Sequence, residues 1–225
     1  MNKKRAYKIL NLLKKHYPNA KIILNYSNNF ELLVSVILSA QTTDIQVNKV
    51  TSKLFPKYKK ENKKYANEYV KYNNLKLSKK EIIEMVNFAC VNLKELENDI
   101  KSIGLYKNKA KNIKFASQYM LDKFNGRVPK TIPDITSLRG VGRKTANVVL
   151  GNAYGIVEGI AVDTHVKRLS QKYGFTKHND PNKIEQDLMR LFDKKDWFKV
   201  TYLLIDHGRN LRKTIKDFIL ERGLL

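Results

Sequence analysis

Residues 138–150 have the sequence LRGVGRKTANVVL, which contains a turn with two glycines. Gly140 and Gly142 flank Val141 between two helical segments, and glycine allows the positive φ angles and close backbone approach that a tight turn needs. The second helix begins directly after the turn, so its first N–H groups lack partners within the helix and lie at the positive end of its dipole. The stretch therefore predicts a helix-hairpin-helix with an anion site at the turn.

The surroundings of the turn decide between two interpretations of it. An ordinary pair of helices joined by a glycine turn would show the same glycine pattern. Here the turn leads into Arg143, Lys144 and Thr145, and the chain carries a formal net charge of +23. A turn of this kind on so basic a chain favours contact with DNA phosphates, which fixes position without reading bases.

Lys144 is the candidate nucleophile. It lies in the first turn of the second helix, where a cationic side chain opposes the helix dipole, and Arg143 adds a like charge. Both effects favour the uncharged amine, which is the form that attacks carbon. The alternative is that Lys144 is one more lysine that contacts phosphate, and this stretch alone does not decide between them.

Residues 160–175, IAVDTHVKRLSQKYGF, supply an acidic partner. Asp163 opens the helix that follows the Lys144 helix, and an antiparallel return would bring both side chains to the same end of the two helices. A carboxylate there can take the proton of the amine and later stabilise positive charge on a sugar. The alternative is a plain N-cap, a role that aspartate fills well. His165 is better suited to a structural role or to donating a hydrogen bond to DNA than to catalysis.

Composition limits the classes of function. The net charge of +23 indicates a polyanionic partner, against the alternative of a surface merely solvated by lysines. Cys90 is the single cysteine, which excludes a disulfide and an all-cysteine metal cluster within these residues and indicates the reducing cytosol. No apolar run reaches the roughly 18 residues that span a membrane, and the basic, amphipathic first 15 residues differ from a signal peptide.

Helical periodicity dominates the rest of the chain, without a convincing alternating strand, so the predicted fold class is all-α. Residues 30–41 are apolar enough to predict a buried helix, with Asn28 and Glu31 as a capping box. We expect Asp44 to cap the next helix, which ends near Pro56. Its apolar residues are Ile45, Val47, Val50 and Leu54. Further helices are expected at 81–89, 93–102, 107–124, 134–138, 143–154, 164–173, 182–192, 196–207 and 211–222.

Residues 57–80 are rich in lysine, with Tyr58, Tyr65, Tyr69 and Tyr72 interleaved. Basic residues with aromatic side chains can line nucleic acid. The favoured interpretation is a solvated helix whose tyrosines contact the body of the protein.

Together these segments resemble endonuclease III, a family of bifunctional DNA glycosylases. Similar stretches cover most of the chain: 31–55, 100–113, 126–155, 160–175 and 203–211. The resemblance implies a helix-hairpin-helix glycosylase fold of two helical lobes with a central cleft for DNA. Residues 22–156 would form the six-helix lobe with the hairpin, and residues 1–21 with 157–225 the second lobe.

The resemblance also implies an activity, namely excision of oxidised pyrimidines from duplex DNA followed by strand cleavage at the abasic site. Lys144 would form a Schiff base at C1′, Asp163 would activate it, and Gln41 and Leu105 would fill the gap and wedge the stack when the nucleotide is flipped out. The other implied DNA-binding residues are Leu138, Arg139, Gly140, Val141, Gly142, Arg143, Thr145 and His165. We expect a monomer in the cytoplasm, at the nucleoid, with duplex DNA that holds a damaged base or an abasic site as its partner and with no membrane contact.

The chain departs from the family at three points. Members usually end in a four-cysteine [4Fe–4S] loop, but Leu211 stands near the first ligand position and the other ligands are absent, so we predict no cluster and no other cofactor. Arg139 stands where proline is usual. Residues 57–98 are longer than their counterpart. A monovalent cation on the hairpin carbonyls is a further family feature.

Two alternatives to this function stay open. One is a sister glycosylase for G·T mismatches or purine lesions. The other is a non-catalytic helix-hairpin-helix protein that only binds DNA.

Overall fold

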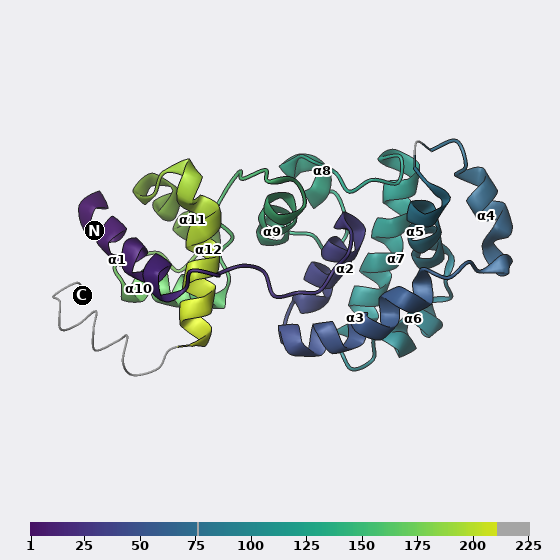
Figure 1. Cartoon of the computed structure of the whole chain (residues 1–225), viewed down its shortest axis with the longest axis horizontal. Coiled ribbons are helices and arrows are strands. Elements are labelled where there is room, and N and C mark those ends of the chain that lie inside the picture. Colours follow the sequence, from purple (N-terminus) through teal and green to yellow (C-terminus); the bar gives the residue numbers. More distant parts are fainter. Residues whose placement is uncertain (76, 211–225) are drawn as a thin grey trace. The chain divides into compact units, whose positions relative to one another are not determined.

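The computed structural model describes residues 1–75 and 77–210, and within them every regular element is helical. The all-α expectation is confirmed for this part of the chain. The chain divides into two compact units (Figure 1). The central unit comprises Ile23–Tyr154, and the terminal unit comprises Met1–Ile22 with Gly155–Leu225. None of the helices in the described residues is both long and apolar enough to cross a membrane.

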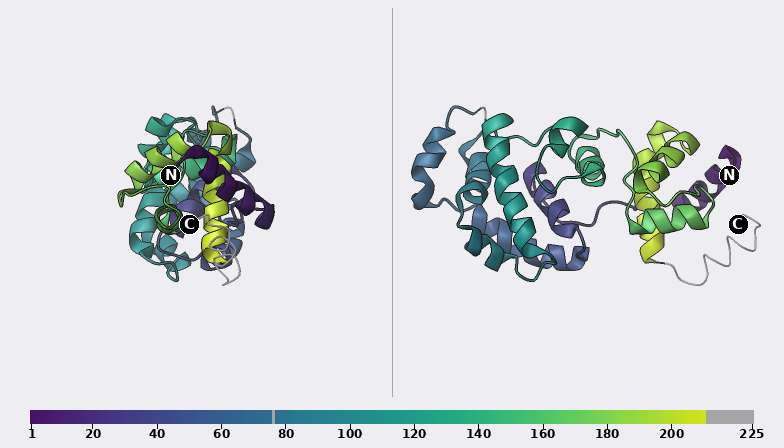
Figure 2. Two further views of the ribbon diagram at one scale, coloured as in Figure 1. Left: turned by 90° about the vertical axis from the view of Figure 1, so that its left-hand side faces the viewer. Right: turned by 180° about the vertical axis from the view of Figure 1, so that it is seen from behind.

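The central unit is built around a helix that is buried on all sides. Every residue from Phe30 to Leu38 in this helix is buried, as its apolar sequence predicts. Side by side in this unit, α5 lies between α4 and α7 (Figures 1 and 2). The helices of the unit are α2 (Asn29–Ser39), α3 (Asp44–Tyr58), the 3-10 helix η1 (Lys63–Tyr65), α4 (Ala66–Lys71), α5 (Lys79–Cys90), α6 (Leu93–Asp99), α7 (Tyr106–Lys123), α8 (Ile132–Thr136) and α9 (Arg143–Tyr154).

The start of α2 follows the expected capping pattern with one change. The side chain of Asn28 accepts a hydrogen bond from the Glu31 N–H at 2.8 Å, so Asn28 is the N-cap. In a capping box the Glu31 carboxylate would return to the Asn28 N–H. It accepts instead from the Ser27 N–H, one residue earlier.

The expected N-cap of α3 is wrong. Thr43 is the N-cap, with Oγ1 accepting from the Gln46 N–H at 3.3 Å, and Asp44 is the first helical residue. The error arises because threonine and aspartate both cap helices well. The helix ends at Tyr58, near Pro56 as expected. Ile45 is 80% exposed, because it lies off the face of the helix that packs on the core.

The lysine–tyrosine segment packs its aromatic rings inward. Tyr58, Tyr65, Tyr69 and Tyr72 are all buried. The Tyr72 hydroxyl donates to Asp122 at 2.6 Å, and the Tyr58 ring stacks on Phe88 with centroids 4.1 Å apart. The expectation that the tyrosines contact the body of the protein is therefore confirmed, and stacking of these four rings on nucleic acid is excluded because they have no free face. The expectation of a single helix is wrong, since the segment comprises the end of α3, η1 and α4.

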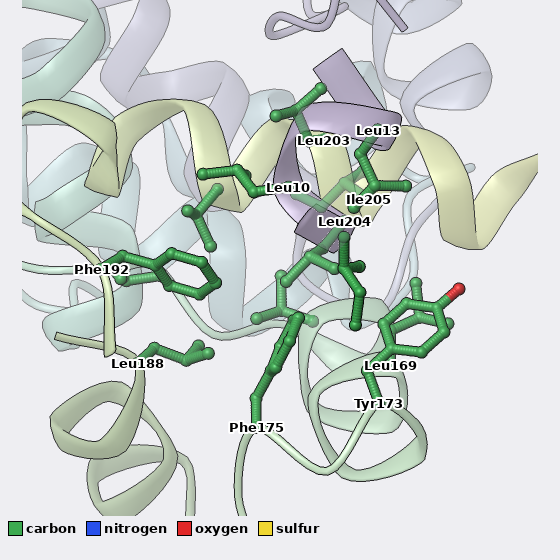
Figure 3. Packing of buried hydrophobic residues seen from close by; sticks show 14 of the residues in the cluster. Leu10, Leu13, Leu169, Tyr173, Phe175, Leu188, Phe192, Leu203, Leu204 and Ile205 are labelled. Atoms are coloured by element: carbon green, nitrogen blue, oxygen red, sulfur yellow. The ribbon is translucent and has the colours of Figure 1, made fainter. Parts of the chain in front are cut away.

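The terminal unit packs the N-terminal helix and three later helices on one apolar core (Figure 3). It contains α1 (Lys3–His16), α10 (Thr164–Lys172), α11 (Pro181–Leu191) and α12 (Lys194–Arg209). α1 packs against α12, although about 180 residues separate them in sequence. Phe175 and Phe192 meet edge to face in this core, with centroids 5.4 Å apart. The expected helix at 211–222, with Leu211, lies outside the described residues.

His207 of α12 is a fully buried ionisable group in this unit. Its Nδ1 lies 3.1 Å from the hydroxyl of Tyr17, and its Nε2 bonds with the hydroxyl of Tyr173. A neutral imidazole has one donor and one acceptor nitrogen, so the two tyrosines take opposite roles. Burial lowers the pKa of His207 from 6.5 to about 4, so the ring is neutral in the folded protein at pH 7.

Acid should therefore destabilise the terminal unit through His207. Below pH 6.5 the unfolded chain binds a proton that the folded chain does not, so the free energy of unfolding should fall by about 1.4 kcal/mol per pH unit down to pH 4. Above pH 6.5 this contribution is constant. Trp197, the single tryptophan, lies against the terminal core and reports the transition by fluorescence in urea. His207→Gln should remove this slope, and parallel pH profiles for the two proteins would contradict the assignment.

Candidate active site on the helix-hairpin-helix

The hairpin is closed by backbone hydrogen bonds. After α8, the Val141 N–H donates to the Leu138 carbonyl at 3.1 Å, and the Ala146 N–H donates to the Gly142 carbonyl at 2.9 Å, which starts α9. Leu138 and Val141 are 1% and 6% exposed and anchor the turn. Both side chains are buried, so these two residues serve the site by holding the turn in place.

Only one of the two turn glycines is required by the backbone. Gly140 has φ +81°, and a Cβ atom there would lie 2.5 Å from Nδ2 of Asn112, on α7. Gly142 has no positive φ, and a Cβ atom there would meet nothing within 4 Å. Gly142 also provides no side chain to cap α9, which leaves the helix start accessible to an anion.

Basic side chains surround this helix start. Arg143 and Lys144 are exposed in the first turn of α9, and Thr145 is half-buried. The exposed Arg139 places its guanidinium 5.1 Å from the ring centroid of Phe115, on α7. This cation–π contact fixes the hairpin to α7, a role that proline at this position could not fill.

Gln41 and Leu105 lie on two adjoining loops of the central unit. Both are exposed, and both have left-handed backbone conformations, with φ +54° and +57°. The Gly104 N–H donates to Oγ1 of Thr42 at 3.2 Å, so the residue before Leu105 bonds with the residue after Gln41. Residues with a Cβ atom rarely adopt this conformation, and such strained positions cluster at functional sites.

Lys109 bonds with the first of these loops and was not predicted from the sequence. Lys109 lies in α7, is 4% exposed, and donates to the carbonyls of Leu38 and Ala40 at 2.8 and 2.5 Å. One signal was available, since Lys109 shares the helix face of the core residue Ile113, four positions later.

Asp163 and His165 belong to the terminal unit. The Asp163 Oδ1 accepts from the Val166 N–H at 2.8 Å, so Asp163 is the N-cap of α10. Capping uses one carboxylate oxygen, and Oδ2 makes no hydrogen bond to the residues that the structure describes. His165 Nδ1 lies 3.5 Å from Nη2 of Arg168, whose guanidinium also donates to the Gly208 carbonyl.

Comparison with known proteins identifies the family of this fold. The sequence profile of the HhH-GPD superfamily base excision DNA repair proteins matches residues 34–194. Endonuclease III of Synechocystis is 44% identical over 92% of this chain and 84% of its own, and that of Bacillus subtilis is 43% identical over 86% and 77%.

The chain belongs to the endonuclease III family. Two solved structures agree, a non-covalent endonuclease III–DNA complex (TM-score 0.80, 39% identity) and a trapped endonuclease III–DNA covalent intermediate (TM-score 0.79, 40% identity). Each comparison covers 93% of this chain and 87% of the other. As a member of this family, the protein is a base excision DNA repair enzyme, a DNA glycosylase with AP lyase activity.

The [4Fe–4S] cluster usual in the endonuclease III family does not fit the residues present. Such a cluster takes four cysteine thiolates, whereas these 225 residues contain only Cys90. Cys90 lies at the end of α5 in the central unit, and burial raises the pKa of its thiol. Among the described residues, no three His, Cys, Asp or Glu side chains gather into a metal site.

The two turn glycines should respond differently to the same substitution. Gly140→Ser adds a side chain at positive φ against Asn112 and should cost about 1–2 kcal/mol or more of central-unit stability. Gly142→Ser has open space and places a favoured N-cap residue before α9, so stability should be maintained or rise slightly. Urea unfolding followed by circular dichroism measures both. An equal loss in the two variants would contradict the geometry of the turn.

Proposed function

We propose that this endonuclease III family member excises oxidised pyrimidines from duplex DNA and cleaves the strand at the resulting abasic site. The observation that carries the proposal is the exposure of Lys144 in the first turn of α9, directly after the glycine turn. A lysine there can form a Schiff base, which a glycosylase without lyase activity does not need. The substrate class rests on the family resemblance.

The proposed chemistry begins with attack of the uncharged amine of Lys144 on C1′. The glycosidic bond breaks and the base leaves with its electron pair. The C1′–O4′ bond then breaks, O4′ takes the proton that Asp163 received from the amine, and the open sugar is left as an iminium ion on the lysine. Loss of a proton from C2′ then drives β-elimination, which breaks the C3′–O bond with the 3′ phosphate as leaving group. Hydrolysis of the remaining Schiff base frees the lysine, so these reaction steps need no redox cofactor.

In this mechanism Asp163 receives the proton of the Lys144 amine and faces the positive charge that develops on the sugar. Its role as N-cap does not prevent this, since only Oδ1 is used in capping. A carboxylate held by a helix start is also fixed in orientation, which favours a single productive geometry.

The proposed partner is duplex DNA with a damaged base or an abasic site. The hairpin would hold a phosphate through backbone N–H groups of Gly140, Gly142 and the start of α9, with Arg139, Arg143 and Thr145 beside it. Gln41 and Leu105 would enter the duplex as the damaged nucleotide leaves, and His165 would face the backbone. Bound DNA would also offset the net charge of +23, and we place the protein at the bacterial nucleoid.

Borohydride trapping on an abasic-site duplex tests the role of Lys144. The unaltered enzyme should cross-link to DNA, and Lys144→Gln should lose the cross-link because no other amine is held at C1′. Lys123→Gln, which makes the same change at an exposed lysine of α7, is the matched control and should cross-link normally. A cross-link that survives in Lys144→Gln would assign the nucleophile elsewhere.

Asp163→Asn separates capping from catalysis. Asparagine caps helices as well as aspartate does, so the variant should fold and bind DNA, with an unchanged melting temperature. It cannot accept the proton, so single-turnover base excision should fall by about 100-fold or more. Unchanged turnover would leave Asp163 with the capping role alone.

A further inference from the structure

All three N–H donors of the Lys109 side chain bond with the end of α2 and the loop that follows it. An ammonium group has three N–H donors. Those of Lys109 go to the carbonyls of Leu38 and Ala40 and to Oγ1 of Thr42, the last at 3.1 Å. The two carbonyls lie at the C-terminal end of α2, where backbone acceptors lack partners and a positive charge is favourable.

Burying the ammonium group of Lys109 costs free energy, and a residue that only fills the core would avoid this cost. Lys109 is 4% exposed and has no carboxylate partner among the described residues. Burial lowers its pKa to about 8. Methionine would fill the same space without desolvating a charge, so the value of the lysine lies in what its three bonds hold in place.

The bonds lie beside Gln41 and Leu105, which are two of the three non-glycine residues with positive φ among the described residues; the third is Asn125. The Ala40 carbonyl and the Thr42 hydroxyl lie on either side of Gln41. The backbone N–H of Lys109 donates to the Leu105 carbonyl at 3.1 Å, which is the first i→i−4 bond of α7 and does not depend on the side chain. The side chain of Lys109 therefore bonds with the flanks of Gln41, and its link to Leu105 runs through Thr42.

Gly104 completes the connection between the two loops. A Cβ atom at Gly104 would lie 3.0 Å from the Gln41 carbonyl, so glycine lets the loops approach. Oγ1 of Thr42 accepts from both Gly104 and Lys109. The conformations of Gln41 and Leu105 are therefore coupled through shared hydrogen bonds.

We propose that Lys109 is a positioning residue for base extrusion, which holds Gln41 and Leu105 in their left-handed conformations before DNA arrives. This inference rests on the proposed function, since it needs the two side chains to enter the duplex. A loop that is ordered in advance loses less conformational entropy on insertion, so insertion is faster. Leu105 is 56% exposed, so its side chain can enter the duplex without first leaving a buried position.

Lys114 provides a matched control on the same helix. It lies five residues after Lys109, and its Nζ donates to the carbonyls of Ala89 and Val91 at the end of α5, at 2.5 and 2.9 Å. Burial lowers its pKa as well. Lys114 therefore caps a helix in the same way as Lys109, but it bonds with neither the Gln41 loop nor the Leu105 loop.

The test compares Lys109→Met with Lys114→Met in full-length protein. The probe is a duplex with 2-aminopurine opposite a tetrahydrofuran abasic analogue, which has no base to excise and no C1′ hydroxyl for Schiff-base formation. Stopped-flow fluorescence then reports insertion alone. We expect insertion to slow about tenfold or more in Lys109→Met and to stay within about twofold of the unaltered enzyme in Lys114→Met. Equal rates in the two variants would overturn the inference.

One further variant and one further assay complete the test. Thr42→Val removes only the shared acceptor, so it should slow insertion in the same direction even if Lys109→Met fails to fold. An insertion rate in Thr42→Val equal to that of the unaltered enzyme would count against the inference. Excision of thymine glycol by the unaltered enzyme tests the proposed function separately, because the insertion assay does not depend on which lesion the enzyme removes.

Discussion

Each helix of this protein leaves four N–H and four carbonyl groups without partners inside the helix, and these groups must be satisfied from elsewhere. Most helix starts are satisfied by the side chain of the preceding residue, among them Asn2, Asn28 and Thr131. Lys109 and Lys114 satisfy carbonyls at two helix ends. The start of α7 at Leu105 has no side-chain cap, which is also true of α4 and α12, and Gly142 before α9 has no side chain. Of these helix starts, those of α7 and α9 carry proposed contacts with DNA.

Burial of neighbouring side chains holds the exposed residues of the hairpin in place. The hairpin is rigid because Leu138 and Val141 are buried and because Gly140 fits over Asn112, so exposed Lys144 is carried on a fixed support. The described residues of the terminal unit form a continuous apolar core (Figure 3). That core provides stabilisation by hydrophobic burial, which does not require the ligands of a metal cluster.

Local features of the sequence predicted much of this architecture, and long-range contacts account for most of what it missed. Periodicity and glycine placement indicated the buried helix at 30–41 and the hairpin, because both depend on neighbours within one or two turns. The choice of Thr43 over Asp44 as N-cap was missed because both residue types cap helices well. The role of Lys109 could not be derived, since its acceptors lie 67–71 residues earlier in the chain. The burial of His207 between Tyr17 and Tyr173 likewise appears only when the chain ends meet.

The proposed function depends on attack by Lys144, at the start of the hairpin helix, on the sugar of a damaged pyrimidine nucleotide. Peptide mass spectrometry can locate this attack in the unaltered enzyme, trapped by borohydride while it turns over a thymine glycol duplex. We expect the reduced sugar adduct on Lys144 in nearly all of the trapped protein. An adduct on another lysine or on the N-terminal amine, or no adduct with an active enzyme, would rule out Lys144 as the nucleophile.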